Sequence, residues 1–303
     1  MSLRDFGVLS DGRSVQEVTL GNGRLTAQFL TFGARINGLS FDEIDDLTPT
    51  LDLEAAAGSN PYSGVIVGPV MNRLGGARAP LNGQVLTFNA NEGSNLLHSG
   101  AAGLHRLVWD IADVSETAVT FAVDLRPDTF PGRRQIEVTY RLEDADLVLE
   151  IAGTTDVPTL MNVGFHPFWT VSGRGRAGHV LQVHGAQYLP MDGGNIPTGE
   201  IADVVGTALD YRIPRAPADD IDHCFVLPEH DGIAPCVTLE SDVMRLEILS
   251  DAPAVHVFTG MDIGIAVEPE IHPDAPNHAG FPSIRLGSGE TFHQTVIHRF
   301  SRR

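Results

Sequence analysis

The chain has 303 residues, of which 42% are hydrophobic and 19% are charged. This composition is that of a globular protein and excludes long disordered stretches. Its 39 acidic and 20 basic side chains give a net charge of −19, which repels nucleic-acid phosphates and anionic membrane surfaces. A neutral, hydroxyl-rich small molecule is compatible with this charge.

Signals for export and membrane insertion are missing from the sequence. The first residues, MSLRDFGVLSDGRS, lack the apolar core of a signal peptide, and no later stretch reaches the roughly 18 continuous apolar residues of a membrane helix. We therefore expect a soluble protein of the cytoplasm. Cys224 and Cys236 have no zinc-site spacing and are too few for a disulfide framework. We expect two reduced, partly buried thiols, with a single bridge as the alternative.

Strand patterns dominate the chain. Period-two spacing of β-branched and aromatic residues predicts a strand at residues 25–32, and the only helical candidate, residues 51–57, is short and is followed by Gly58. Later strands are expected at residues 119–125, 136–142, 147–152, 244–249 and 255–259. The acidic turn EDAD, residues 143–146, predicts that two of these strands form an antiparallel hairpin.

The shortage of amphipathic helices excludes alternating β/α architectures. The 32 glycines and 19 prolines are distributed as turn punctuation, which favours an all-β fold built as a many-stranded antiparallel sandwich. A chain of this length would also accommodate two domains. Because no repeat, low-complexity tract or linker divides it, we expect residues 1–303 to form one β-sandwich domain. Residues 173–178 are expected to form an exposed loop.

His166 is the first candidate for proton transfer. It stands in the aromatic run NVGFHPFW, where burial would lower the pKa of an imidazolium unless a carboxylate balanced its charge. The neighbouring aromatic rings also suit a sugar, whose C–H faces stack on them. The alternative interpretation is a core histidine that is hydrogen-bonded to a backbone carbonyl.

Glu268, in the run AVEPEIHPDAPN, is the second candidate. Residues 263–267 alternate bulky and small side chains, which places Glu268 on the face opposite the bulky ones. Pro269 lacks an amide donor, so we expect the strand to end there. Glu270 would share a side with Glu268, and their repulsion would raise the pKa of one of them. A solvated strand end is the alternative.

Four further polar residues follow or precede apolar runs. The planar guanidinium of Arg73 could bind vicinal hydroxyls or a carboxylate. His98 could add one more hydrogen bond, and the carboxylate of Asp222 could accept hydrogen bonds from two hydroxyls. Asn72 precedes Arg73 in the same cluster. Each of these residues alone also fits a purely structural role.

Together these motifs resemble the aldose 1-epimerases, the galactose mutarotase family. The resemblance runs in order over nearly the whole chain, and its final block is the most specific. The matching segments are NGRLTAQFLTFGARINGL, GPVMNRLGGARAPLNG, NEGSNLLHSG, NVGFHPFW, DDIDHCFVL and EPEIHPDAPNHAGFPSIRLGSGE.

The resemblance implies an antiparallel β-supersandwich with a sugar cleft on its concave side. In that family the Glu matching Glu268 is the base on the C1 hydroxyl, and the His matching His166 protonates the ring oxygen. Residues matching Arg73, His98 and Asp222 hold the sugar hydroxyls, and Asn72 is a further candidate for sugar contact. The implied reaction needs no metal and no organic cofactor, and we expect His166 and Glu268 on opposite sides of one hollow.

Some positions depart from the family pattern. Pro269 and Glu270 replace a more polar, usually uncharged pair, which puts an extra carboxyl close to the expected base. Phe168 and Trp169 lack the tyrosine hydroxyl often found after the histidine. The segment DDLTPTLDLEAAAGSN lacks the usual glycine-bearing lead-in. These departures affect the identity of the sugar more than the class of reaction.

Three alternatives stay open beside an epimerase of neutral aldoses. One is a sugar-binding module that has lost its chemistry. Another is an epimerase of phosphosugars or sugar acids, which would need a second basic residue near Arg73; the candidates are Arg35, Arg78 and Arg106. The third is metal binding by His98, His166 and Glu268, whose spacing in the sequence is wide. The oligomeric state is expected to be a monomer or a homodimer.

Overall fold

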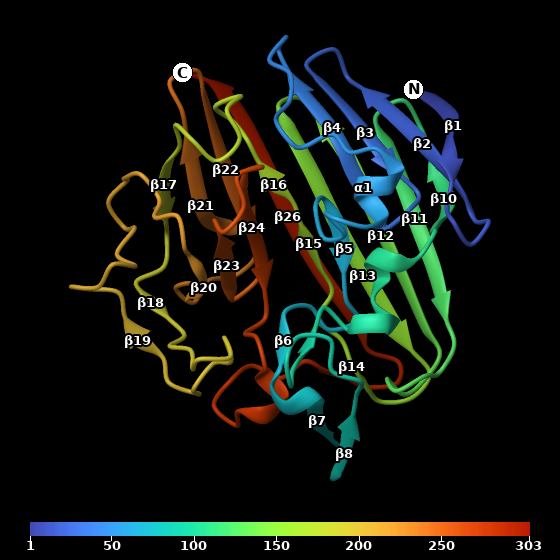
Figure 1. Ribbon diagram of the computed structural model, residues 1–303, viewed down its shortest axis with the longest axis vertical. Coiled ribbons are helices and arrows are strands. Elements are labelled where there is room, and N and C mark those ends of the chain that lie inside the picture. The colour runs from blue at the N-terminus through green and yellow to red at the C-terminus, as the bar shows by residue number, and fades with distance from the viewer.

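The computed structural model describes residues 1–303, and its strands form three larger sheets and four two-stranded ribbons (Figure 1). Every pairing between named strands is antiparallel, as predicted. The chain contains no helix that is long and apolar enough to cross a membrane.

The three larger sheets account for most of the strands. The four-stranded sheet has the order β1 (Ser2–Val8), β2 (Ser14–Gly21), β3 (Leu25–Leu30), β4 (Arg35–Phe41). The eight-stranded sheet has the order β10 (Asp110–Val114), β11 (Ala118–Leu125), β12 (Arg134–Glu143), β13 (Asp146–Thr155), β26 (Thr291–Arg302), β22 (Met244–Ser250), β21 (Ala234–Glu240), β17 (Val180–Val183). The six-stranded sheet has the order β16 (Phe168–Trp169), β24 (Ile265–Glu270), β23 (Ala254–Phe258), β20 (Asp222–Val226), β18 (Gln187–Tyr188), β19 (Ala202–Asp203).

Short ribbons and helices connect these sheets. The ribbons are β14 (Thr159–Leu160) with β25 (Arg285–Leu286), β15 (Gly164–His166) with β5 (Val65–Val67), β6 (Arg73–Leu74) with β9 (Leu96–Leu97), and β7 (Arg78–Leu81) with β8 (Gln84–Thr87). The helical segments are α1 (Leu53–Ala57) and the 3₁₀ turns η1 (Gly75–Ala77), η2 (Gly100–Ala102), η3 (Leu104–Arg106) and η4 (Ala275–Asn277).

The core lies between the eight-stranded sheet and the two other large sheets. Its main cluster contains 47 buried residues, drawn from both ends of the chain. Phe29 on β3 packs on Tyr140 of β12 with ring centroids 4.5 Å apart, and Trp169 on β16 packs on Phe300 of β26 at 5.7 Å. The four-stranded sheet therefore covers one half of the eight-stranded sheet, and the six-stranded sheet covers the other half (Figure 1).

The predicted local elements are confirmed with small shifts of their ends. The hairpin is formed by β12 and β13, which run in register as far as Glu143 opposite Asp146. The helix α1 starts where Asp52 accepts a hydrogen bond from the amide of Ala55 at 2.8 Å, an N-cap that an aspartate favours. Residues 173–178 form a largely exposed loop.

Two expectations need correction. Both cysteines are free, and they are fully rather than partly buried. The strand β24 does not end at Pro269 but continues to Glu270, with Pro269 opposite Val255. Because the neighbouring β16 pairs only with Ile265 and Ala266, β24 has an edge at Pro269 where a missing amide donor removes no ladder bond.

Candidate active site

A cavity of about 390 Å³ opens on the face of the six-stranded sheet that points away from the core. All six of the residues singled out from the sequence line it: Asn72, Arg73, His98, His166, Asp222 and Glu268. The volume lies within the range of about 300–1,000 Å³ that is usual for small-molecule pockets. Residues from seven strands and from several loops thus meet at one hollow, which has both an apolar and a polar wall.

Glu268 reaches the cavity because of its position in β24. Val267 faces the core, so its neighbour Glu268 points to the opposite side, as the alternation predicted. The side chain is only 2% exposed. Burial, with the nearby charge of Asp222 as the second cause, raises the pKa of Glu268 well above its ordinary value. As predicted, repulsion between the two carboxyls raises the pKa of one of them: the pKa of Glu270 is raised first by burial and then by the charge of Glu268.

His166 ends the short strand β15 and lies directly beside Glu268. Its Nε2 is 3.5 Å from Oε1 of Glu268, so the expectation that the two groups face each other across the hollow is wrong. Burial lowers the pKa of His166 to about 3, as its aromatic surroundings indicated. Nδ1 of His166 and Oε2 of Glu268 are buried without a hydrogen-bond partner, an arrangement that is uncommon in protein interiors and typical of sites awaiting a ligand.

Close backbone packing brings this pair next to the segment that carries Asn72 and Arg73. Gly164, two residues before His166, lies against the side chain of Met71, and a Cβ at this position would collide with it. A larger residue at this position would require the end of the Met71 side chain to move. Asn72 and His98 both adopt positive φ angles, 57° and 47°. Such angles cost energy in residues other than glycine, so the surrounding contacts must hold this conformation in place.

His98 is fixed by Asn72 through two hydrogen bonds. The backbone amide of Asn72 donates to Nδ1 of His98 at 3.1 Å, and the amide of His98 donates to the carbonyl of Asn72 at 2.9 Å. Because Nδ1 acts as an acceptor, the proton of the neutral ring must sit on Nε2. Burial keeps His98 neutral, since it lowers the pKa of the ring well below its ordinary value. His98 can therefore donate one hydrogen bond to a ligand oxygen.

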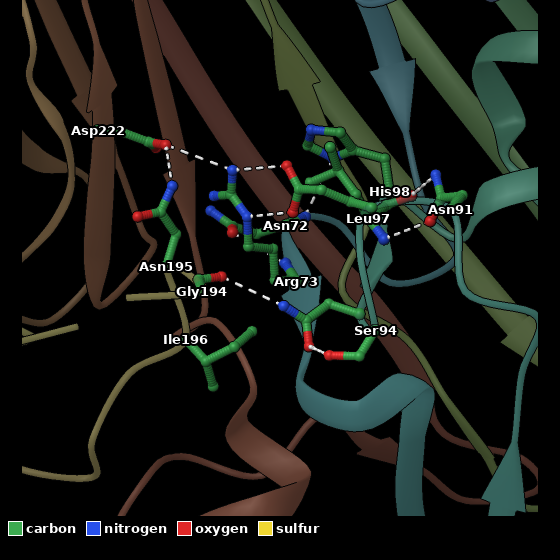
Figure 2. Close-up of polar contacts among 12 residues, drawn as sticks. Asn72, Arg73, Asn91, Ser94, Leu97, His98, Gly194, Asn195, Ile196 and Asp222 are labelled. Atoms are coloured by element: carbon green, nitrogen blue, oxygen red, sulfur yellow. Dashed lines mark hydrogen bonds and ion pairs between the residues drawn. The ribbon is translucent and has the colours of Figure 1, made fainter. Parts of the chain in front are cut away.

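Arg73 is held between two carboxylates on the polar wall of the cavity. Its Nε and Nη2 donate to Glu92 at 2.6 and 3.0 Å, and Nη2 also contacts Oδ2 of Asp222 at 3.3 Å. Figure 2 shows Arg73 reaching toward Asp222, with Asn195 donating to the same carboxylate. The guanidinium fork that the sequence assigned to a ligand is thus largely engaged within the protein.

Asp222, the first residue of β20, is oriented by His256. Nε2 of His256 donates to Oδ1 of Asp222 at 2.6 Å, and Nδ1 of His256 accepts from the side-chain amide of Asn72 at 3.1 Å. Burial alone would raise the pKa of Asp222, but the hydrogen bond from His256 and the charge of Arg73 outweigh it and lower the pKa well below its usual range. Asp222 is therefore a carboxylate, able to accept hydrogen bonds from hydroxyls.

The apolar wall comes from rings and aliphatic side chains around His166. Tyr62 stacks on His166 with centroids 6.1 Å apart, and Phe168 stacks on the same imidazole at 5.3 Å. Phe258, Met261 and Ile263 complete this side. An amphipathic ring with C–H faces and hydroxyl edges matches a hollow that is apolar on one side and rich in hydrogen-bonding groups on the other.

Comparison with known proteins agrees with this geometry. The family model described as aldose 1-epimerase matches residues 16–299. The chain belongs to the aldose 1-epimerase family. Galactose mutarotase of Rattus norvegicus is 28% identical over 98% of this chain and 97% of its own length. Aldose 1-epimerase of Haemophilus influenzae is 29% identical over 88% of this chain and 90% of its own. Epimerases and mutarotases are isomerases, so the chain is an enzyme of that class.

Solved structures show that the family's fold is also present. The aldose epimerase homologue from C. elegans superposes with a TM-score of 0.89 at 25% identity, covering 94% of this chain and 98% of that one. The galactose 1-epimerase from Lactobacillus acidophilus gives a TM-score of 0.87 at 23% identity, covering 99% and 98%. The galactose mutarotase-like antiparallel β-supersandwich inferred from the sequence motifs is thereby confirmed.

The cavity residues that the sequence did not indicate include Tyr62, Glu92 and His256. His256 alternates with the core residues Val255 and Val257, a signal that it faces the opposite side of β23. Glu92 lies inside the motif NEGSNLLHSG, which also contains the predicted site residue His98. Tyr62 gave no signal, because it lies in an irregular loop. It supplies the phenol that Phe168 and Trp169 lack.

Two groups of side chains in this family member have ligand atoms close enough to hold a metal ion. They are His98, His166 and Glu268 in the cavity, and Cys224, His256 and Glu270 behind it. In each group the atoms lie within 4.8 Å of one another, so the wide sequence spacing of the first group is no obstacle. The first group is also the set of residues that a proton-transfer reaction would use.

Proposed function

We propose that the protein is an aldose 1-epimerase that interconverts the α and β anomers of a neutral aldose. The observation that carries this proposal is the adjacent His166–Glu268 pair, with a 3.5 Å contact, at the wall of a sugar-sized cavity. The anomeric hydroxyl and the ring oxygen of an aldose are bonded to the same carbon atom. An acid and a base that are neighbours can therefore reach both oxygens at once.

Glu268 acts as the base on the C1 hydroxyl and His166 as the acid on the ring oxygen. Ring opening moves a proton from O1 to Glu268 and another from His166 to the ring oxygen, which leaves a neutral carboxyl and a neutral imidazole. The freed aldehyde rotates about the C1–C2 bond, and closure on its other face returns both protons. The pair holds one proton in both states, so no net proton enters or leaves.

The pKa shifts of Glu268 and His166 support the stage of this cycle at which the sugar is an open-chain aldehyde. Burial raises the pKa of Glu268 and lowers that of His166, so each group favours its neutral form. This is the protonation state that the pair has when the aldehyde is free to rotate. The reaction requires no metal and no organic cofactor, because proton transfer by positioned groups contributes typically about 10²–10⁴ in rate.

The remaining polar groups hold the sugar. His98 donates from Nε2, and Asp222 accepts from hydroxyls while His256 and Arg73 fix its orientation. Asn72 acts through His98 and His256 rather than through the sugar, because its amide and carbonyl groups are already engaged with the protein. Tyr62 and Phe168 stack on the apolar face of the ring.

Anomer exchange on freshly dissolved sugars tests the proposal directly. Polarimetry or exchange NMR with galactose, glucose, xylose and arabinose should show equilibration faster with protein than without it. The variant Glu268→Gln keeps the size of the side chain but removes the base, and should lower kcat by about 10²–10⁴. Calorimetry should still detect sugar binding to this variant.

Three results would contradict the assignment. If none of the four sugars equilibrates faster with protein, the proposed substrates are wrong. If Glu268→Gln keeps the wild-type rate, Glu268 is not the base. If sugars bind without turnover to both forms, the protein is a sugar-binding module rather than an epimerase.

A further inference from the structure

Among the charged side chains that line the cavity, acidic ones outnumber basic ones. Arg73 is the only cationic residue among them, and it faces three carboxyl residues, Glu92, Asp222 and Glu268. The chain contains no lysine, so any further positive charge would have to come from another of its 20 basic residues, all of them arginine.

None of the other candidate arginines lines the cavity. Arg35 is fully buried behind the loop of residues 59–63, where it donates to backbone carbonyls. Arg78 is exposed on β7, and Arg106 lies on η3, also outside the cavity lining. Burial lowers the pKa of His98 and His166, so these two rings add no charge. The ring of His256 is held between the side-chain amide of Asn72 and the carboxylate of Asp222.

Glu92 is the carboxylate that a ligand approaching Arg73 meets. The Arg73 side chain is 9% exposed, whereas that of Glu92 is 38% exposed. Nε of Arg73 donates to one oxygen of Glu92, and Nη2 donates to the other and to Asp222. Only Nη1 has no carboxylate contact. An incoming phosphate or carboxylate would therefore displace one of two ion pairs or lie beside their negative charge.

We propose that the cavity selects aldoses by charge and that Glu92 is the residue that sets this selection. Aldoses that carry a phosphate or a carboxylate are rejected, and uncharged aldoses and those that carry an ammonium group are accepted. This inference rests on the proposed epimerase function and narrows its substrate class. Even with Glu268 protonated, two carboxylates outnumber one guanidinium, so the field in the hollow opposes anions.

Three sugars that differ only at C6 test the proposal: glucose, glucuronate and 6-amino-6-deoxyglucose. Anomer exchange and calorimetric binding are measured for each with wild type, Glu92→Gln and Glu116→Gln. Glu116 is exposed and lies outside the cavity. Its variant therefore makes the same change in the net charge of the protein without changing the charge of the cavity. In the wild type we expect kcat/KM for glucose to exceed that for glucuronate at least about tenfold, and the amino sugar to match glucose or surpass it.

Glu92→Gln should reduce the ratio of glucose to glucuronate about tenfold, because it removes one negative charge and frees the Arg73 fork. Glu116→Gln should leave the ratio unchanged. Raising the salt concentration should also narrow the ratio in the wild type, which tests the inference without any substitution. Equal use of glucose and glucuronate by the wild type would overturn the proposal, as would an unchanged ratio in folded Glu92→Gln.

Failure of the epimerase function itself gives a different pattern. In that case no sugar exchanges faster with protein, but calorimetry still reports whether binding follows the order of charge. Binding of glucuronate as tight as that of glucose would then refute charge selection independently of turnover.

Discussion

The contact between His166 and Glu268 decides what the site can do. Side by side, these groups can reach the two oxygens that are bonded to one hemiacetal carbon, the C1 hydroxyl and the ring oxygen. Desolvation favours the neutral form of each group, so the pair titrates as a unit rather than as two independent sites. Its pH behaviour therefore differs from that of an exposed histidine.

We predict that kcat/KM for anomer exchange does not fall as the pH is lowered through the ordinary histidine range near 6.5. The active pair carries one proton, and a second proton enters only when neutral His166 is protonated, near its lowered pKa of about 3. Initial rates between pH 7 and pH 5 measure this. A loss of activity centred near pH 6.5 would mean that His166 is not shielded from water in the working enzyme.

The sequence was sufficient to predict which residues line the site, but not which hydrogen bonds and ion pairs they form. Family motifs and apolar runs identified His98, Arg73 and Asp222, and all three line the cavity. Their partners were missed, because Glu92 and His256 act on residues that are distant along the chain. An ion pair between distant segments leaves no local pattern, and only the folded sheet shows that Arg73 is already engaged.

For single strands, the alternation of bulky and small side chains correctly predicted which residues face the core. The position of a proline did not correctly predict where a strand ends. The side of β24 that carries Glu268 followed from side-chain size alone, since a strand must turn its bulky residues to the core. The strand end at Pro269 did not follow, because that inference required knowing which edge of β24 has a partner. Hydrogen-bond pairing is a property of two strands, and one sequence window contains only one of them.

The loop of residues 59–63 is the least regular wall of the cavity, and Arg35 on β4 holds it. The guanidinium of Arg35 donates to the carbonyl oxygens of Ala56, Asn60, Pro61 and Ser63. No carboxylate pairs with it, and all of its hydrogen bonds go to backbone carbonyls. This arrangement fixes the position of Tyr62, which stacks on His166.

We predict that Arg35→Lys raises KM about tenfold with a smaller change in kcat. A lysine cannot span four carbonyls, so the loop that carries Tyr62 loosens, while the His166–Glu268 pair stays on its own strands. Stability should fall by about 1.5–3 kcal/mol for each charged-donor bond that is lost. Steady-state kinetics and urea unfolding measure both effects.

Asp52→Ala provides the control for this prediction. It removes the N-cap of α1 and should cost about 1 kcal/mol, while Arg35 keeps its bonds to Asn60, Pro61 and Ser63 in the loop. KM should therefore remain at its wild-type value. If both variants raise KM equally, general loosening rather than the Arg35 contacts positions the loop.

For the whole molecule, the fold class could be predicted from the sequence but the sheet order could not. Many short strands, abundant turn residues and few helices were sufficient to infer an antiparallel sandwich. The hairpin of β12 and β13 followed because its strands are adjacent in sequence. The pairing of β13 with β26 did not, because more than a hundred residues separate them and no local pattern encodes the partner.

We predict that the free energy of unfolding decreases as the pH is lowered from about 6.5. Burial lowers the pKa of His166 and His298 to about 3 and that of His105 and His272 to about 4. The unfolded chain takes up these protons first, so each such histidine costs about 1.4 kcal/mol per pH unit within the window. Glu268 and Glu270, with raised pKa values, act in the opposite direction but are fewer.

Urea unfolding at pH 7 and at pH 5.5 measures this slope. The variant His298→Phe isolates one group, since His298 packs against Trp169 and Phe165, where a phenyl ring fits the same surroundings. Between pH 7 and pH 5.5 its free energy of unfolding should fall by about 1.2 kcal/mol less than that of the wild type. Equal slopes for the two proteins would show that His298 is accessible to protons in the native state.

The position of β26 has a consequence for biosynthesis. This strand lies in the middle of the eight-stranded sheet, between β13 and β22, and it follows all of the strands that it joins (Figure 1). A nascent chain that is still held by the ribosome therefore exposes two open sheet edges, one on each side of the gap. Until β26 has been synthesised, those edges are free to pair with strands of other chains, so aggregation competes with folding at this stage.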